Sequence, residues 1–213
     1  MNLIDRVRAL LPRTKLFIAI ASAWVIADHV AKFLAVTYLT KAFEPLVGEP
    51  PGFFSRLWIW LTHAHPARAP GVEVFEYFWR FRYVENPGAA WGFLGGAVAW
   101  FRTPFFLMVA AAAMVFIVVY HRRTLPEQGM LRVALACVFG GALGNFLDRL
   151  RFGYVIDFVD WHWYDRFTWP TWNIADAGIT VGVSLLILDM LLHKPPEAAK
   201  DKGKKKPAEP EAS

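Results

Sequence analysis

The chain has 213 residues, of which 56% are hydrophobic and only 19% are charged, and this composition excludes an ordinary soluble domain. A net charge of +5 would suggest nucleic acid as a partner of a soluble protein. Here the placement of the basic residues beside apolar segments explains the charge better. We therefore expect a membrane protein with no nucleic-acid partner.

Four apolar segments have about the 20 residues that an α-helix needs to cross a bilayer. They are residues 16–39, 101–120, 131–147 and 174–192. Basic residues precede the first segment, flank the connection between the second and third, and follow the fourth. By the positive-inside rule, both termini are expected in the cytoplasm and the loops 40–100 and 148–172 outside. We expect a membrane domain over residues 1–193 and a disordered cytoplasmic tail over residues 194–213.

The two outward loops carry predicted elements of their own. Residues 53–62 could form a short helix, and residues 77–84 alternate with the period of a strand. A second strand-like piece covers residues 154–159. The fold class we predict is an all-α membrane protein, a bundle of four transmembrane helices with a small extracytoplasmic β-sheet. The sequence assigns no role to the long outward loop over residues 40–74.

Carboxylates beside apolar segments indicate chemistry, because burying an ionisable group costs free energy. Asp157 in GYVIDF and Asp176 in WNIADAGITVG are the strongest candidates, and Asn173 lies three residues before Asp176. Two carboxyl groups that share a site cannot both ionise cheaply, so one can take a proton from water while the other donates one. A simpler reading is that Asp157 caps a loop and Asp176 pairs with Arg149.

Other catalytic chemistries have little support in the sequence. It contains no HExxH and no G-x-S-x-G motif, which are typical of zinc proteases and serine hydrolases. His63 and His65 form at best half a metal site. Gly140, Gly141 and Gly144 are expected to permit close helix packing. We therefore predict that the protein needs no metal and no other cofactor.

Four sequence blocks resemble the signature blocks of lipoprotein signal peptidase, the bacterial signal peptidase II. They are NPGAAWGF at residues 86–93, GNFLDR at 144–149, VIDF at 155–158 and WNIADAGITVG at 172–182. A further block, DHVAK at residues 28–32, is similar to the family's D-x-x-[ST]-K, although Ala31 replaces the hydroxyl residue.

The resemblance implies an aspartic endopeptidase of the bacterial inner membrane that removes signal peptides from prolipoproteins. Cleavage is implied just before the cysteine that carries the diacylglyceryl group. Asp157 and Asp176 match the family's catalytic dyad, at the extracytoplasmic face. The family fold also includes a β-cradle and a short outer helix that can close over the site.

The same resemblance assigns further residues and partners. It implies substrate-binding roles for Asn86, Asn145, Arg149 and Asn173, and supporting roles for Asp28, Gly88 and Asp148. Inhibition by globomycin, a cyclic peptide that mimics the substrate, is expected. We also expect contact with membrane lipids and a monomeric enzyme.

Simpler roles exist for some of these residues. Asn86 could only shape the turn at Pro87–Gly88, Arg149 could pair with Asp148, and Asp28 could simply neutralise Lys32 one helical turn away. Two other protein classes also remain open. A proton-coupled transporter would place acids near mid-span in repeated halves, and a membrane scaffold would leave these acids without a task.

Overall fold

The computed structural model describes residues 3–45, 48–88, 94, 96–125, 127–164 and 166–192, and it describes side chains from residue 13 onward. The tail expected over residues 194–213 and most of the NPGAAWGF block lie outside the described residues.

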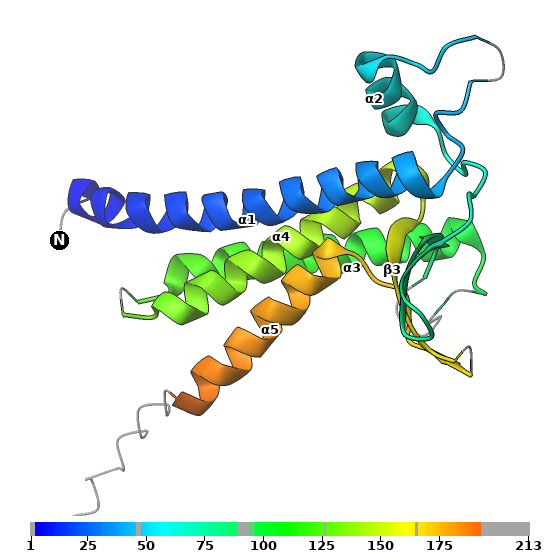
Figure 1. The fold of residues 1–213 in the computed structure, drawn as a ribbon. Coiled ribbons are helices and arrows are strands. Elements are labelled where there is room, and N and C mark those ends of the chain that lie inside the picture. The colour runs from blue at the N-terminus through cyan, green and yellow to red at the C-terminus, as the bar shows by residue number, and fades with distance from the viewer. Residues whose placement is uncertain are drawn as a thin grey trace, which may run out of the picture.

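The described residues form five helices. They are α1 (Leu3–Leu39), α2 (Phe53–Thr62), α3 (Ala99–Arg123), α4 (Gly129–Phe152) and α5 (Ile174–Leu192). Four helices in this part of the chain are long and apolar enough to cross a bilayer, namely Arg13–Leu39 of α1 together with α3, α4 and α5. These four helices form a bundle, with α2 and the sheet at one end of it (Figure 1). The predicted bundle of four spans is confirmed.

The span over α4 is longer than the sequence suggested. The helix continues to Phe152, so Asp148 and Arg149 lie in its last two turns and not in an outward loop that begins at residue 148. Gly153 then adopts the left-handed conformation, with φ 78°, which ends the helix without strain on a side chain. The chain therefore turns directly from α4 into a strand.

A four-stranded antiparallel sheet caps the bundle. Its strands lie in the order β1 (Val72–Phe75), β2 (Trp79–Asn86), β3 (Val155–Trp163) and β4 (Phe167–Thr168). The small sheet is thus confirmed, with two changes of boundary. The piece expected over residues 77–84 begins only at Trp79, because Tyr77 lies at φ 65° in the turn after β1. The second piece extends beyond residue 159, to Trp163.

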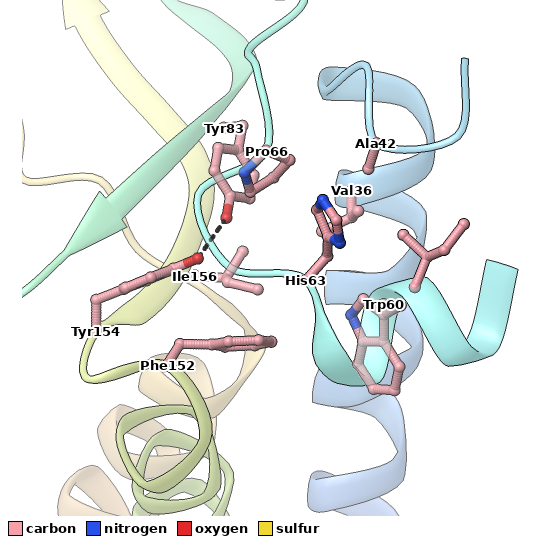
Figure 2. A pocket seen from close by; sticks show the side chains of 10 residues that line it. Val36, Ala42, Trp60, His63, Pro66, Tyr83, Phe152, Tyr154 and Ile156 are labelled. Atoms are coloured by element: carbon pink, nitrogen blue, oxygen red, sulfur yellow. Dashed lines mark hydrogen bonds between the residues drawn. The ribbon is translucent and has the colours of Figure 1, made fainter. Parts of the chain in front are cut away.

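Side chains of the short helix α2 pack against α1 and the sheet. Trp60 of α2 contacts Phe33 of α1 edge-on, with ring centroids 5.7 Å apart. The hydroxyls of Tyr83 and Tyr154 lie 3.3 Å apart, and Figure 2 shows these two tyrosines and Trp60 around a small cavity. Its volume is about 10 Å³, which is room for one water at most. This part of the outer core is therefore filled by side chains.

Glycines let α4 approach two helices at once. A Cβ on Gly141 would overlap the carbonyl oxygen of Ala175 on α5, and one on Gly144 would lie 2.7 Å from Oδ2 of Asp28 on α1. Only residues without a side chain permit such close backbones. The predicted packing role of these glycines is confirmed, and it draws α1, α4 and α5 together beneath the sheet.

Candidate active site

Asp157 is placed by the sheet. It lies on β3 opposite Val84 of β2, and its side chain is 1% exposed. The strand consists largely of β-branched and aromatic residues, which favour extended backbone. Because β3 follows α4 after only the turn at Gly153, the carboxyl group lies close to the end of the bundle that carries the sheet.

Asp176 is placed by the start of α5. The side-chain Oδ1 of Asn173 accepts the backbone N–H of Asp176 at 3.0 Å, and Oδ2 of Asp176 accepts the backbone N–H of Asn173 at 3.2 Å. This reciprocal pair is a capping box, which satisfies two N–H groups that the helix leaves unpaired. It fixes Asp176 in the first turn, where a negative charge is favoured.

Amide side chains join the two carboxylates. Asn173 donates through Nδ2 to Oδ1 of Asp157 at 2.7 Å and to Oδ1 of Asn145 at 3.1 Å. Asn145, on α4, donates through its own Nδ2 to Oδ1 of Asp176 at 2.8 Å. Residues from β3, α4 and α5 therefore form one hydrogen-bonded cluster around the two acids. The alternative that Asp157 merely caps a loop is therefore wrong, because its carboxylate accepts hydrogen bonds from amide side chains.

Asn86 performs two tasks with the two ends of its amide. Its Oδ1 accepts the backbone N–H of Gly88 at 3.1 Å, which shapes the turn, and its Nδ2 donates to Oδ2 of Asp157 at 2.9 Å. Asn86 therefore does shape this turn, but the alternative that it does nothing else is wrong, because the same side chain also contacts Asp157.

Arg149 contacts the backbone of that turn. Its Nη2 donates to the carbonyl of Gly88 at 2.7 Å, and its guanidinium lies 4.8 Å from the ring centroid of Phe106 on α3. The contact with Phe106 was not expected, since no sequence motif connects the two residues. Asp148, the alternative partner of Arg149, accepts a charged hydrogen bond from Lys32 instead.

Lys32, Asp28 and Asp148 form an ion triad, by which we mean these three side chains together. Nζ of Lys32 lies 2.7 Å from Oδ2 of Asp28 and 2.7 Å from Oδ2 of Asp148. All three residues are 0% exposed. The pairing of Asp28 with Lys32 is confirmed. The third member was missed, because it comes from another helix and its place in the sequence gives no sign of the contact.

The electrostatics of Asp157 suit a proton donor. Burial, with the nearby charge of Asp176 as a second cause, raises the pKa of Asp157 to about 8, against the opposing effects of Asn86, Lys32 and Asn173. Burial thus disfavours the charged form of this carboxyl group. Asp176 is only partly buried, so the two acids occupy different environments, as acid–base chemistry requires.

No metal cluster is apparent in the part of the chain that the structure describes. No three residues of the types His, Cys, Asp and Glu gather there as a possible ligand set. What the arrangement offers is a pair of carboxyl groups, a ring of amide donors and one guanidinium. Such a site, at one end of a transmembrane bundle, can activate water and polarise a peptide carbonyl.

Comparisons with known proteins agree on one family. The model of the family described as signal peptidase (SPase) II matches residues 20–192. A lipoprotein signal peptidase of an Anaeromyxobacter species is 49% identical over 168 residues, which cover 77% of this chain and 79% of the relative. The lipoprotein signal peptidase of Syntrophus aciditrophicus is 38% identical over 160 residues, covering 75% and 94% of the two chains. A solved bacterial membrane enzyme is similar with a TM-score of 0.59 and 29% identity, covering 92% of this chain and 95% of that one.

The four-span bundle and the family match together define a multi-pass membrane peptidase of bacterial type. The chain belongs to the signal peptidase II family, and its function lies in the removal of signal peptides from lipoproteins. It is thus an enzyme that hydrolyses peptide bonds in a bacterial membrane.

Proposed function

We propose that the protein is an aspartic endopeptidase that cleaves diacylglyceryl-modified prolipoproteins just before the lipidated cysteine, with Asp157 and Asp176 as its catalytic dyad. The observation that carries this proposal is the single residue Asn173, which donates to both carboxylates. It holds one buried and one partly buried acid beside each other at the outward end of the bundle. Asp157 acts as the acid and Asp176 as the base.

The reaction begins with a water molecule between the two carboxyl groups. Asp176 takes a proton from this water as its oxygen bonds to the scissile carbonyl carbon, and Asp157 donates its proton to the carbonyl oxygen. The product of this step is a neutral tetrahedral diol. The two carboxyl groups have then exchanged protonation states.

Collapse of the diol restores the enzyme. Asp176 gives its proton to the nitrogen of the lipidated cysteine, and the C–N bond breaks. Asp157 recovers a proton from a hydroxyl group of the diol, which becomes the new carboxyl terminus of the signal peptide. Each atom and proton is thereby accounted for, and no cofactor takes part.

We further propose that Asn86, Asn145, Arg149 and Asn173 hold the substrate backbone. A signal peptide that enters from the bilayer brings unpaired N–H and C=O groups, and each costs several kcal/mol in an apolar medium. Amide side chains and a guanidinium can pair with such groups. Gly88 supports the site through its carbonyl, which Arg149 holds.

The proposed orientation places both termini in the cytoplasm and the site at the extracytoplasmic face. The N-terminal end of α1 and the C-terminal end of α5 lie at the end of the bundle opposite the sheet (Figure 1), which is consistent with basic residues on one membrane side. Membrane lipids surround the bundle, and we propose that one chain forms the complete site.

One experiment tests the reaction and the dyad together. Purified protein receives a diacylated prolipoprotein, and mass spectrometry locates the new N-terminus, which we expect at the lipidated cysteine. Asp157→Asn and Asp176→Asn should each lose activity while remaining folded. Asp160→Asn, which removes another buried carboxylate of β3, is the matched control. Retention of most activity in either dyad variant refutes the assignment, and a wild type that releases no signal peptide would favour a transporter or a scaffold.

Globomycin provides an independent test of the substrate site. If the peptide mimics the substrate at the dyad, it should inhibit cleavage competitively. It should also raise the melting temperature of the wild type, because a ligand that binds only the folded protein stabilises it. Full cleavage activity without inhibition would contradict this proposal.

A further inference from the structure

Each of the two carboxylates in the ion triad accepts a hydrogen bond from a backbone N–H. In both cases the N–H belongs to the residue just before a proposed catalytic aspartate. Oδ1 of Asp28 accepts the backbone N–H of Ala175 at 2.9 Å, and Oδ2 of Asp148 accepts the backbone N–H of Ile156 at 3.1 Å. Ala175 directly precedes Asp176, and Ile156 directly precedes Asp157. The same geometry therefore occurs twice, on α5 and on β3, with one lysine between the two anchors.

We propose that the ion triad is a positioning device that sets the distance between the two proposed catalytic carboxyl groups. This inference rests on the proposed function, because it takes Asp157 and Asp176 as the dyad. Lys32 is the central member, since its Nζ lies 2.7 Å from both anchoring carboxylates. None of the three side chains touches the reacting atoms in this scheme.

Charge explains why a cation must stand at the centre. Asp28 lies on α1 and Asp148 on α4, and two carboxylates this close would repel each other in a medium that water does not reach. The positive charge of Lys32 attracts both carboxylates and offsets their mutual repulsion. Its Nζ also lies 3.5 Å from Oδ1 of Asn145, the residue that donates to Asp176. The cation is thus linked to the dyad by three separate routes.

Stability alone does not account for the triad. Buried ion groups lose their hydration, and apolar side chains of similar volume usually stabilise a fold as well or better. What apolar side chains cannot do is hold two specific backbone N–H groups at fixed positions. Because a displacement of about 1 Å in an active site can cost about a hundredfold in rate, such anchoring matters for catalysis.

Two glycines of α4 offer a test that leaves every charge in place. A methyl group added at Gly144 would lie 2.7 Å from Oδ2 of Asp28 and 3.2 Å from Cβ of Ala175, so either Asp28 must move within the triad or α4 must move away from it. One helical turn earlier, a methyl group at Gly140 would lie 2.8 Å from the carbonyl oxygen of Ala21 and 2.8 Å from Cβ of Trp24. Gly140→Ala strains the same pair of helices without touching the triad, which makes it the matched control.

We expect Gly144→Ala to lower kcat by about a hundredfold with little change in KM, measured below the melting temperature of each variant. Gly140→Ala should keep kcat near the wild-type value, even if its melting temperature falls by as much as that of Gly144→Ala. A split between kcat and KM identifies lost transition-state stabilisation, which mere destabilisation would not produce. Equal kcat values in the two variants would overturn the inference.

Removal of the charge provides a second test. We expect Lys32→Met to lose kcat at least as strongly as Gly144→Ala. Its control is Asp160→Asn, which removes a fully buried carboxylate that pairs with Arg80 and Arg82 at 2.7 and 2.6 Å. If Lys32→Met does not fold, the comparison of kcat between Gly144→Ala and Gly140→Ala tests the proposal. A folded Lys32→Met enzyme with the kcat of Asp160→Asn would overturn the proposal.

These results can be separated from a failure of the proposed function. If Asp157→Asn or Asp176→Asn remained active, the dyad itself would be wrong. If both were inactive while Gly144→Ala kept the wild-type kcat, the dyad would stand and only the positioning role would fall.

Discussion

Arg151 holds the outer helix at Trp60 by two contacts at once. Its guanidinium lies 4.4 Å from the ring centroid of Trp60, and its Nη2 donates to the carbonyl of the same residue at 2.7 Å. Arg151 belongs to the last turn of α4, so α2 is attached to the same helix end that precedes β3 and Asp157. The contact links a segment of the loop between the first two spans to the end of α4.

We expect Arg151→Ala to loosen α2 by roughly 1–3 kcal/mol, because it removes both a cation–π contact and a charged hydrogen bond. Hydrogen exchange of the α2 amides should become faster by a corresponding factor, with the amides of α5 unchanged. Arg151→Lys should give only partial recovery, since a lysine cannot stack and donate with the same geometry. Unchanged exchange in α2 would show that other contacts hold the helix.

The pH dependence of cleavage should report the proton on Asp157. Burial and the charge of Asp176 raise the pKa of this group to about 8, and the protonated form is the proposed acid. Activity should therefore be present below this pKa and fall as the pH rises through it. The measurement is kcat/KM against pH, which reports groups of the free enzyme. A rate that keeps rising well above pH 8 would assign the acid role elsewhere.

Asn86→Ala should move this alkaline decline to higher pH. The amide of Asn86 donates to the carboxylate of Asp157 and favours its charged form, so its loss raises the pKa of Asp157 further. The overall rate should fall as well, because a substrate-binding amide is removed. Asp160→Asn serves as the control and should leave the decline in place. A shift of the decline toward lower pH in Asn86→Ala would contradict the inference that the Asn86 hydrogen bond lowers the pKa of Asp157.

Arg149→Lys should reduce kcat/KM by about tenfold or more, because a lysine cannot both hold the Gly88 carbonyl and lie flat on Phe106. Phe106→Leu tests the ring contact alone and should have a smaller effect. Steady-state kinetics of both variants separates the two contributions. If Arg149→Lys had the same kcat/KM as the wild type, a positive charge at this position would be enough for activity, and the contacts with Gly88 and Phe106 would not be required.

Cleavage should also be insensitive to chelators, because two carboxyl groups carry the whole proposed reaction. Activity measured before and after prolonged treatment with EDTA should agree. Loss of activity that added zinc restores would require a metal in the reaction and would contradict the mechanism.

Much of the architecture could be predicted from local sequence. A span of about 20 apolar residues must form a helix in lipid, since only internal hydrogen bonds satisfy its backbone there, and the four spans followed from this rule. The short helix at residues 53–62 was also predicted with the bounds that α2 has in the structure. Strand boundaries were less accurate, because a turn residue such as Tyr77 fits the alternating pattern of the strand that follows it.

The sequence by itself determined which residue types the site would contain, because acids and amides beside apolar segments stand out by their cost of burial. Only the tertiary structure decided how they meet: that Asn173 joins Asp157 to Asp176, and that Lys32 pairs with two carboxylates. These contacts join residues that are distant in the chain, and they depend on how closely α1, α4 and α5 approach. Local sequence patterns specify helices and strands, whereas side-chain distances across them arise from packing of the whole bundle.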